Sequence, residues 1–251
     1  MHGFANPKRF LSFARPLTPW LLALGLALAG GALFWGLTRV PAERLQGETV
    51  RILFLHVPAA WLGMAGWMTI AGASLAEIVW RHPLAAIAGR AAAVPGAFFT
   101  ALCLVTGSLW GRPAWGTWWE WDGRLTSMLV LLFLYLGYIA LSQATAREGA
   151  SSRIPAIFGL FGVINVPVIH FSVTWWYSIH QPPSFSLGKS AMATAFQVPL
   201  LASTMGFTCL FAAVVLMRMR ALLAETQAEA RLRRRAREAD GDAGQLREAG
   251  A

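Results

Sequence analysis

Six apolar runs alternate with polar segments along this chain, and few charged residues interrupt them. A helix needs about 20 apolar residues, within a range of about 17–25, to cross the hydrocarbon core of a bilayer. Each run falls in or near that range. We therefore predict an all-α integral membrane protein with six transmembrane helices. The predicted spans cover residues 17–37, 52–80, 91–109, 125–141, 154–173 and 192–217.

This pattern divides the chain into a basic head, 1–16, a six-helix membrane domain, 17–217, and a charged tail, 218–251. The tail is rich in alanine and arginine and carries RLRRRAR at 231–237. Charge-rich segments without apolar positions bury too little surface to fold on their own. We expect the tail to be a solvated helix that frays into partial disorder.

The distribution of charge predicts the orientation of the spans. Only 13% of residues are charged and 56% are hydrophobic, whereas soluble domains carry about 25% charged residues. Of the 21 Lys and Arg residues, 15 lie in the head, the tail and the two loops that share their side, and 6 lie opposite. By the positive-inside rule, both termini are cytoplasmic. The net charge of +9 therefore indicates topology and not nucleic-acid binding.

A tryptophan-rich stretch joins the third and fourth runs on the predicted outer side. Residues 110–124 read WGRPAWGTWWEWDGR and hold five of the twelve tryptophans. Tryptophan suits a membrane–water boundary, so some of them are explained by anchoring alone. This density favours a flat aromatic platform for a ligand, formed by Trp115, Trp118, Trp119 and Trp121. A helical stretch would be an interfacial amphipathic helix that pairs Glu120 with Arg124.

Two histidines, His56 and His180, fall on the same predicted outer side. Two neutral imidazoles can supply both axial ligands of a haem iron. Arg51 and Arg124 flank this region and are candidates to hold the propionates. Asp122 lies among the tryptophans and needs a polar partner. On spacing alone, an ordinary interfacial histidine, a zinc site or a soluble ligand remains open.

One further histidine, His170, lies near the outer end of the fifth run. Ionisable groups inside spans are functional candidates, yet His170 and Asn165 would equally serve as hydrogen-bonding groups between helices. The chain contains no HExxH, GxSxG, P-loop or Rossmann motif, so an ATP-driven step would need a partner protein.

Four stretches together resemble a known family. WGTWWEWDGRLTS is similar to the "WWD" signature of haem-handling membrane proteins. LFLHVPAAW, NVPVIHFSVTWW and SIHQPPS, with six spans, resemble haem exporter protein C of the cytochrome c maturation system. The resemblance covers about residues 20–220. It departs at Glu120, where the family pattern leads us to expect an apolar residue, and at Gly123, where it leads us to expect alanine. SIHQPPS is also richer in proline than the family pattern.

The resemblance implies that His56 and His180 bind haem b non-covalently at the periplasmic face of a bacterial inner membrane. It implies delivery to the membrane-anchored haem chaperone CcmE, alongside the ATPase, permease and small membrane subunits CcmA, CcmB and CcmD. The chain itself would not be an enzyme, beyond lyase-like assistance to covalent attachment on the chaperone. The alternatives are a transporter that moves haem or another solute across the bilayer and a haem enzyme that oxidises quinol.

Overall fold

The computed structural model describes residues 6–147, 152–176, 178–180, 185–186, 189–190 and 192–249, with side chains except at 147, 185–186, 189–190 and 239–249. Six of its helical segments are long and apolar enough to cross a membrane, which confirms the predicted class. The QPPS part of the SIHQPPS stretch, residues 181–184, lies outside the described residues. The elements are α1 (Pro7–Thr38), the 3-10 helix η1 (Glu48–Ile52), α2 (Leu53–Trp80), α3 (Ala85–Trp115), α4 (Gly123–Arg147), α5 (Arg153–Gly162), α6 (Asn165–Trp175), the strands β1 (Phe185–Ser186) and β2 (Lys189–Ser190), and α7 (Thr194–Ala249).

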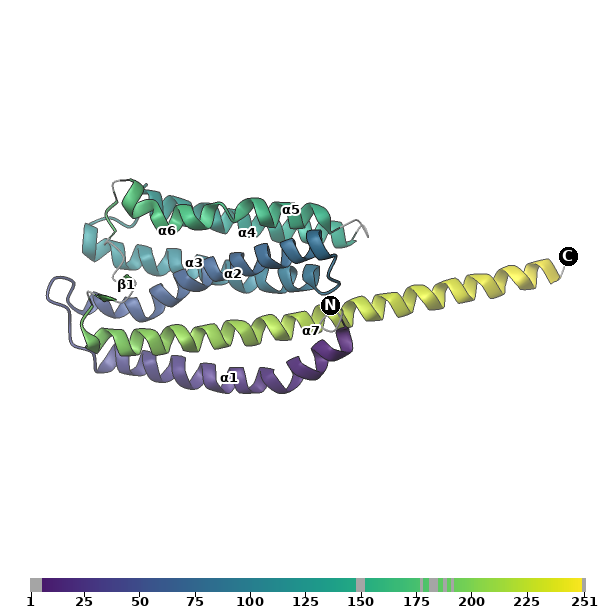
Figure 1. Cartoon of the computed structure of the whole chain (residues 1–251), viewed down its shortest axis with the longest axis horizontal. Helices are drawn as coiled ribbons and strands as arrows, with labels where there is room; N and C mark the ends of the chain where they lie inside the picture. Colours follow the sequence, from purple (N-terminus) through teal and green to yellow (C-terminus); the bar gives the residue numbers. More distant parts are fainter. Residues whose placement is uncertain are drawn as a thin grey trace.

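The helices form three layers that run in roughly one direction (Figure 1). α2 and α3 lie in the middle, α4 lies with α5 and α6 on one side, and α7 and α1 lie on the other. α1 begins, and α7 leaves the bundle, at the same end (Figure 1). The loops at the opposite end carry the tryptophan-rich stretch and the short antiparallel pair β1–β2, in which Phe185 faces Ser190. This opposite end, the predicted outer end, is where His56 and His180 lie.

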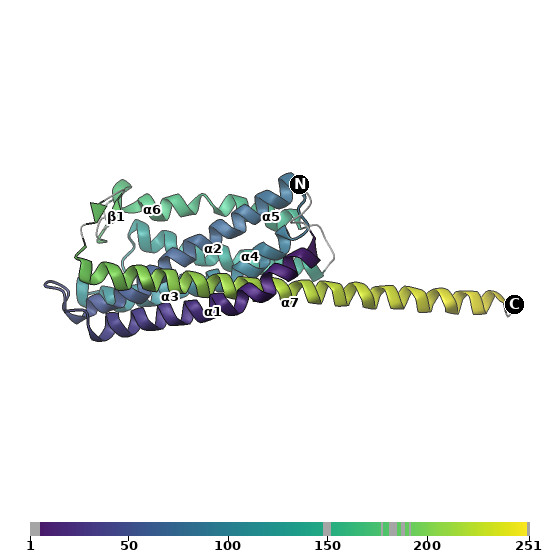
Figure 2. The ribbon, with the colours of Figure 1, turned by 60° about the horizontal axis from the view of Figure 1, so that its bottom comes forward.

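α1 and α7 pack side by side over most of α1, in both views (Figure 2). Their contact depends on small residues. A Cβ atom added at Gly206 of α7 would collide with the backbone of Ala29 in α1, and one at Gly25 would lie 2.8 Å from Leu210. In lipid, where no hydrophobic effect drives helices together, close backbone approach is a main source of association.

The centre of the bundle is filled by large side chains from α2 and α4. Trp67 and Tyr135 are fully buried, with ring centroids 4.9 Å apart in an edge-to-face arrangement. The Tyr135 hydroxyl donates to the carbonyl of Gly63 at 2.7 Å. Gly162 leaves room for the Trp67 ring, because a Cβ there would collide with it. The middle of the bundle is therefore closely packed with side chains, and this packing fixes the positions of the helices that extend to the outer end.

The fifth apolar run forms two helices and not one continuous helix. α5 ends at Gly162 and α6 begins at Asn165. Pro167 has no N–H to bond the carbonyl four residues earlier, and its ring would clash there, so an unbroken helix is disfavoured. Asn165 Nδ2 instead donates to the carbonyl of Ser127 in α4 at 2.9 Å. The expected interhelical role is thus confirmed for Asn165.

Other helix bounds differ from the apolar runs. α1 begins at Pro7, capped by the Asn6 side chain, and therefore includes most of the basic head. α7 continues without a break through the charged tail to Ala249. Helix ends are set by caps and exposed polar turns, which hydropathy does not register. The predicted partial disorder of the tail stays a prediction.

Candidate functional site

A cavity of about 290 Å³ opens at the outer end of the bundle, between α2, α3, α4 and α6. This volume is close to the lower end of the range of volumes of small-molecule pockets. The lining is mainly apolar, with a few polar groups that converge on it. The lining residues are His56, Val57, Ala60, Met64, Cys103, Leu104, Gly107, Ser108, Trp119, Arg124, Leu125, Met128, Ile169, His170 and His180. The predicted convergence of His56 and His180 on one site is therefore seen in the fold.

The tryptophan-rich stretch is not the amphipathic helix that was one expectation. α3 ends at Trp115 because Gly116 adopts the left-handed conformation, with φ at +81°. Residues 117–122 are then irregular, so Glu120 and Arg124 do not form a helical pair. The Ser108 hydroxyl donates to the carbonyl of Trp118 at 2.8 Å and holds this segment against α3.

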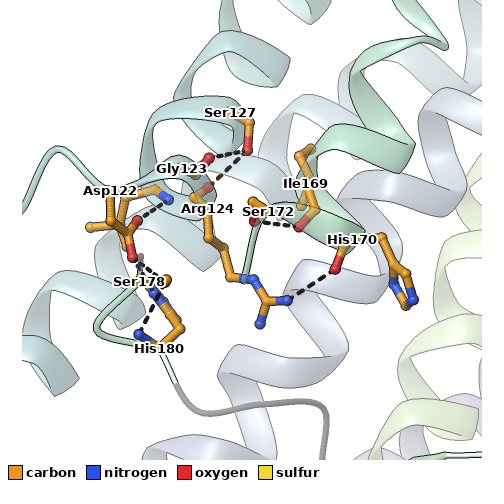
Figure 3. Close-up of polar contacts among 10 residues, drawn as sticks. Asp122, Gly123, Arg124, Ser127, Ile169, His170, Ser172, Ser178 and His180 are labelled. Carbon is orange, nitrogen blue, oxygen red and sulfur yellow. Dashed lines mark hydrogen bonds and ion pairs between the residues drawn. The ribbon is translucent and has the colours of Figure 1, made fainter. Parts of the chain in front are cut away.

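Asp122 is the junction of this segment with α4 and with His180 (Figure 3). One carboxylate oxygen, Oδ1, accepts from the Leu125 N–H at 2.7 Å and caps the first turn of α4. The other, Oδ2, accepts from the Ser178 hydroxyl at 2.6 Å and lies 2.9 Å from His180 Nδ1. The buried acid therefore has the polar partners that the sequence required.

The protonation of this pair follows from its surroundings. Burial tends to raise the pKa of Asp122, but the bonds from Ser178, the Leu125 N–H and His180 outweigh it and hold that pKa below its ordinary value. Burial lowers the pKa of His180 more than Asp122 raises it, so the imidazole is neutral near pH 7. A carboxylate only accepts hydrogen bonds, so the single proton of His180 sits on Nδ1. The lone pair is on Nε2, where a metal can bind it.

His56 has the same tautomer, with the proton on Nδ1, but a different hydrogen-bond partner fixes it. Its Nδ1 lies 3.0 Å from Thr106 Oγ1. Thr106 has one hydroxyl proton, which it donates to the carbonyl of Leu102 at 2.7 Å. Thr106 must therefore accept from His56, which places the proton on Nδ1 and the lone pair on Nε2. A Cβ added at Gly107 would lie 3.0 Å from the imidazole, so glycine makes room for this ring.

The predicted tryptophans do not contribute equally to the site. Only Trp119 lines the cavity, and its buried Nε1 has no hydrogen-bond partner among the described residues. Trp115 packs edge-on against His180, with ring centroids 4.9 Å apart. Trp118 and Trp121 are 55% and 73% exposed and do not line the cavity, although the Trp121 ring packs edge-on against Trp119, with centroids 5.4 Å apart.

The two predicted arginines also differ in position. Arg124 lines the cavity, and its Nη2 donates to the carbonyl of His170 at 3.3 Å. Its Nε is buried without a partner among the described residues, which leaves it a donor for an anionic group. Arg51 is not a lining residue. It pairs with Glu48 at 2.8 Å and donates to the carbonyl of Leu37, so it ties η1 to the end of α1.

Two hydroxyls that were not predicted from the sequence, those of Thr106 and Ser178, position the two histidines. Their partners lie 50 and 56 residues away in the chain, so no local pattern reveals them. At Gly123, where alanine was expected, a Cβ would lie 3.1 Å from the Trp176 ring. Tight packing there accounts for the departure.

The donor set suits haem better than zinc. Among the residues that the structure describes, no three His, Cys, Asp or Glu side chains gather as metal ligands. Structural and catalytic zinc sites use three or four such ligands. Two neutral imidazoles, an apolar wall and an unpartnered arginine nitrogen fit a flat macrocycle that carries an iron and two carboxylates.

Comparison with known proteins identifies the family. The family profile described as Heme exporter protein C matches residues 1–234, so the match reaches further into the tail than residue 220. Heme exporter protein C of Bradyrhizobium diazoefficiens is 48% identical over 217 residues, 86% of this chain and 82% of the relative. The Escherichia coli K12 protein of that name is 42% identical over 223 residues, 89% and 90% of the two chains. The Haemophilus influenzae protein is 39% identical over 230 residues, 91% and 94%. The chain thus belongs to the heme exporter protein C family, whose members are named for haem handling.

Proposed function

We propose that this protein binds haem b non-covalently at the periplasmic face of a bacterial inner membrane and hands it to a membrane-anchored haem chaperone, CcmE. His56 and His180 bind the iron through Nε2, one on each face of the macrocycle. Trp119 packs on the ring and Arg124 binds a propionate. The protein acts as a holder and not as an enzyme, with at most lyase-like assistance to attachment on the chaperone.

The observation that best supports this proposal is that both histidines are held in the same tautomer, with Nε2 free to bind a metal. Each histidine donates a hydrogen bond from its Nδ1–H to an oxygen in a fixed position. His56 bonds Thr106 Oγ1 at 3.0 Å, and His180 bonds Asp122 Oδ2 at 2.9 Å. Metal-bound histidines are oriented in this way by outer hydrogen bonds, which fix the tautomer. Both residues also line one cavity. A pair of interfacial histidines without a ligand would have no reason to share this arrangement.

Handover requires partners that this chain does not supply. The relatives are named heme exporters, and the chain has no nucleotide-binding motif, so CcmA, CcmB and CcmD are the proposed companions for any ATP-driven step. The open side of the site supports release to a chaperone. Trp118 and Trp121 are exposed beside it and offer an aromatic surface for docking.

The transporter alternative receives less support. A path across the bilayer would need polar groups through the middle of the bundle, where Trp67 and Tyr135 are fully buried and in contact. A second cavity near the inner end, of about 80 Å³, is lined by Glu77, Arg90 and Tyr138 and shares no lining residue with the outer cavity.

The test is the absorption spectrum of the purified protein with haem. We expect the Soret and sharp α/β bands of a low-spin, six-coordinate haem in the wild type. His56→Ala and His180→Ala should each give a five-coordinate spectrum that added imidazole restores. His82→Ala, at the other end of the bundle, is the matched control. A wild-type spectrum that survives both site substitutions would overturn the ligand assignment.

A further inference from the structure

His170 is a histidine of the outer cavity that the proposed site does not use. It lines the cavity together with His56 and His180, yet the residue is exposed on α6. Its ring meets the edge of Phe171, with centroids 4.8 Å apart. Among the described residues, its imidazole has no hydrogen-bond partner. An imidazole on the lipid-facing side of a span is costly and is therefore a functional candidate.

Two helices that hardly contact each other, α2 and α6, form the wall of the cavity next to this histidine. α2 packs closely on α5 but hardly touches α6, which packs on α4. The break between α5 and α6 thus separates α6 from α2 over the outer half of the span. The cavity is lined from both sides of this separation, by Val57 and Ala60 of α2 and by Ile169 and His170 of α6. Its side opening therefore lies between α2 and α6, toward the bilayer.

The depth of His170 suits the iron of a haem in the outer leaflet. His170 precedes the last residue of α6, Trp175, by five positions, which is about 7.5 Å along a helix. A haem in a bilayer keeps its two propionates at the headgroup level and its macrocycle in the hydrocarbon. Its iron then lies below the boundary, at the level of His170. Arg124 lies between His170 and His180 in Figure 3, with its guanidinium directed toward α6.

We propose that His170 is a third iron-binding position, at a lateral entrance between α2 and α6 through which haem enters from the outer leaflet. The inference rests on the proposed function, since it assumes that His56 and His180 form the final site. Haem from the bilayer first binds the His170 imidazole through its iron, while Arg124 attracts a propionate. The macrocycle then slides inward past Arg124.

The transfer is a ligand exchange without redox chemistry. The bond from iron to the His170 nitrogen breaks, and bonds from the same iron to Nε2 of His56 and of His180 form. Each imidazole binds the iron through a nitrogen lone pair, and the iron keeps its oxidation state. No proton and no co-reactant is needed. Because His170 acts only on the way in, its loss changes the rate of loading and not the final complex.

The experiment measures both quantities in one preparation. The full-length protein is reconstituted in vesicles of phosphatidylethanolamine and phosphatidylglycerol, haemin is added and partitions into the lipid, and the Soret shift is followed by stopped flow. We expect His170→Ala to reach the wild-type six-coordinate spectrum at least about fivefold more slowly. His170→Gln, which hydrogen-bonds but is a poor iron ligand, should be equally slow. His82→Ala should load at the wild-type rate.

The outcomes separate this inference from the proposed function. Loading of His170→Ala at the wild-type rate would overturn the entrance ligand, and so would rescue by His170→Gln, because it would indicate a hydrogen bond to haem instead. A wild-type protein without a six-coordinate spectrum would overturn the proposed function itself. In the His56→Ala, His180→Ala double variant, we expect a residual five-coordinate haem that disappears when His170→Ala is added.

Discussion

Replacing Asp122 with asparagine tests how the site fixes the protonation of His180. The asparagine oxygen can still cap α4 by accepting from the Leu125 N–H, as Oδ1 does at 2.7 Å. An amide NH₂ then faces His180 Nδ1, where Oδ2 now lies at 2.9 Å. Two donors cannot bond each other, so the imidazole moves its proton to Nε2 and accepts at Nδ1. Nε2, the nitrogen proposed to bind iron, then has no lone pair to offer.

The size of the effect follows from the bonds lost. Outer-sphere partners of metal-bound histidines are worth about 10–100-fold in affinity, or about 1.4–2.7 kcal/mol. Asp122 also raises the pKa of His180, so its removal lowers proton competition at this histidine. Weaker binding in the variant therefore cannot come from protonation, and it should persist at pH 8. We expect Asp122→Asn to bind haem about 10–100-fold more weakly, with a five-coordinate fraction in its spectrum.

The assay is a haemin titration of the protein in lipid nanodiscs, followed in the Soret band at pH 7 and pH 8. Glu120→Gln is the matched control, because it makes the same carboxylate-to-amide change on an exposed side chain two residues away. Unchanged affinity with a six-coordinate spectrum in Asp122→Asn would refute the tautomer argument. An equal loss in Glu120→Gln would show that charge at this surface matters and not the bond to His180.

Four further substitutions or conditions have defined outcomes. In His56→Ala, where His180 is the remaining ligand, haem affinity should stay constant as pH falls through 6.5 and weaken only below it, because burial lowers the pKa of His180. Thr106→Val should weaken binding about 2–10-fold, since it removes the acceptor for His56 Nδ1. Gly206→Val should destabilise the bundle by about 1–3 kcal/mol in thermal unfolding. Trp119→Phe should weaken haem binding yet not destabilise the free protein, because its buried Nε1 has no partner.

Each of these has a control that changes little else. Thr106→Ser keeps the hydroxyl and should bind as the wild type does. Gly30→Val adds the same side chain to α1 at a position with open space around it and should leave stability unchanged. Trp80→Phe alters an exposed ring at the inner end of α2 and should not affect binding. An acid transition at or above pH 6.5 in the His56→Ala protein would contradict the direction of the His180 pKa.

The spans were predictable from the sequence because hydropathy measures what the bilayer requires. The ends of helices were not. Gly116 in the left-handed conformation ends α3, and Asp122 starts α4, so the stretch between them is irregular although it could be drawn as an amphipathic helix. The break before Asn165 depends on Pro167 and on the carbonyl of Ser127 in another helix. Apolar periodicity carries no information on either feature.

The candidate site was predictable as far as topology brings residues to one end. His56 and His180 were placed together from the orientation of the spans, and both line the outer cavity. Arg51 was chosen by the same reasoning and lies elsewhere, because the end of α1 supplies carbonyls that bind its guanidinium. Thr106 and Ser178 could not be found at all. A hydroxyl contributes to a site only when packing places a histidine or a carboxylate beside it, and the local sequence does not show which residue that is.

The length of α7 turns this helix into a spacer. Its 56 residues rise about 84 Å, whereas the hydrocarbon core of a bilayer is about 30 Å thick. More than half of the helix therefore lies outside the hydrocarbon, and much of that part projects from the end of the bundle opposite the outer cavity (Figure 1). A subunit that bound the arginine-rich part of α7 would be held at a fixed distance from the membrane surface. It would also be held at a fixed angle around the helix axis, so inserting one residue into α7 would turn that subunit by about 100°.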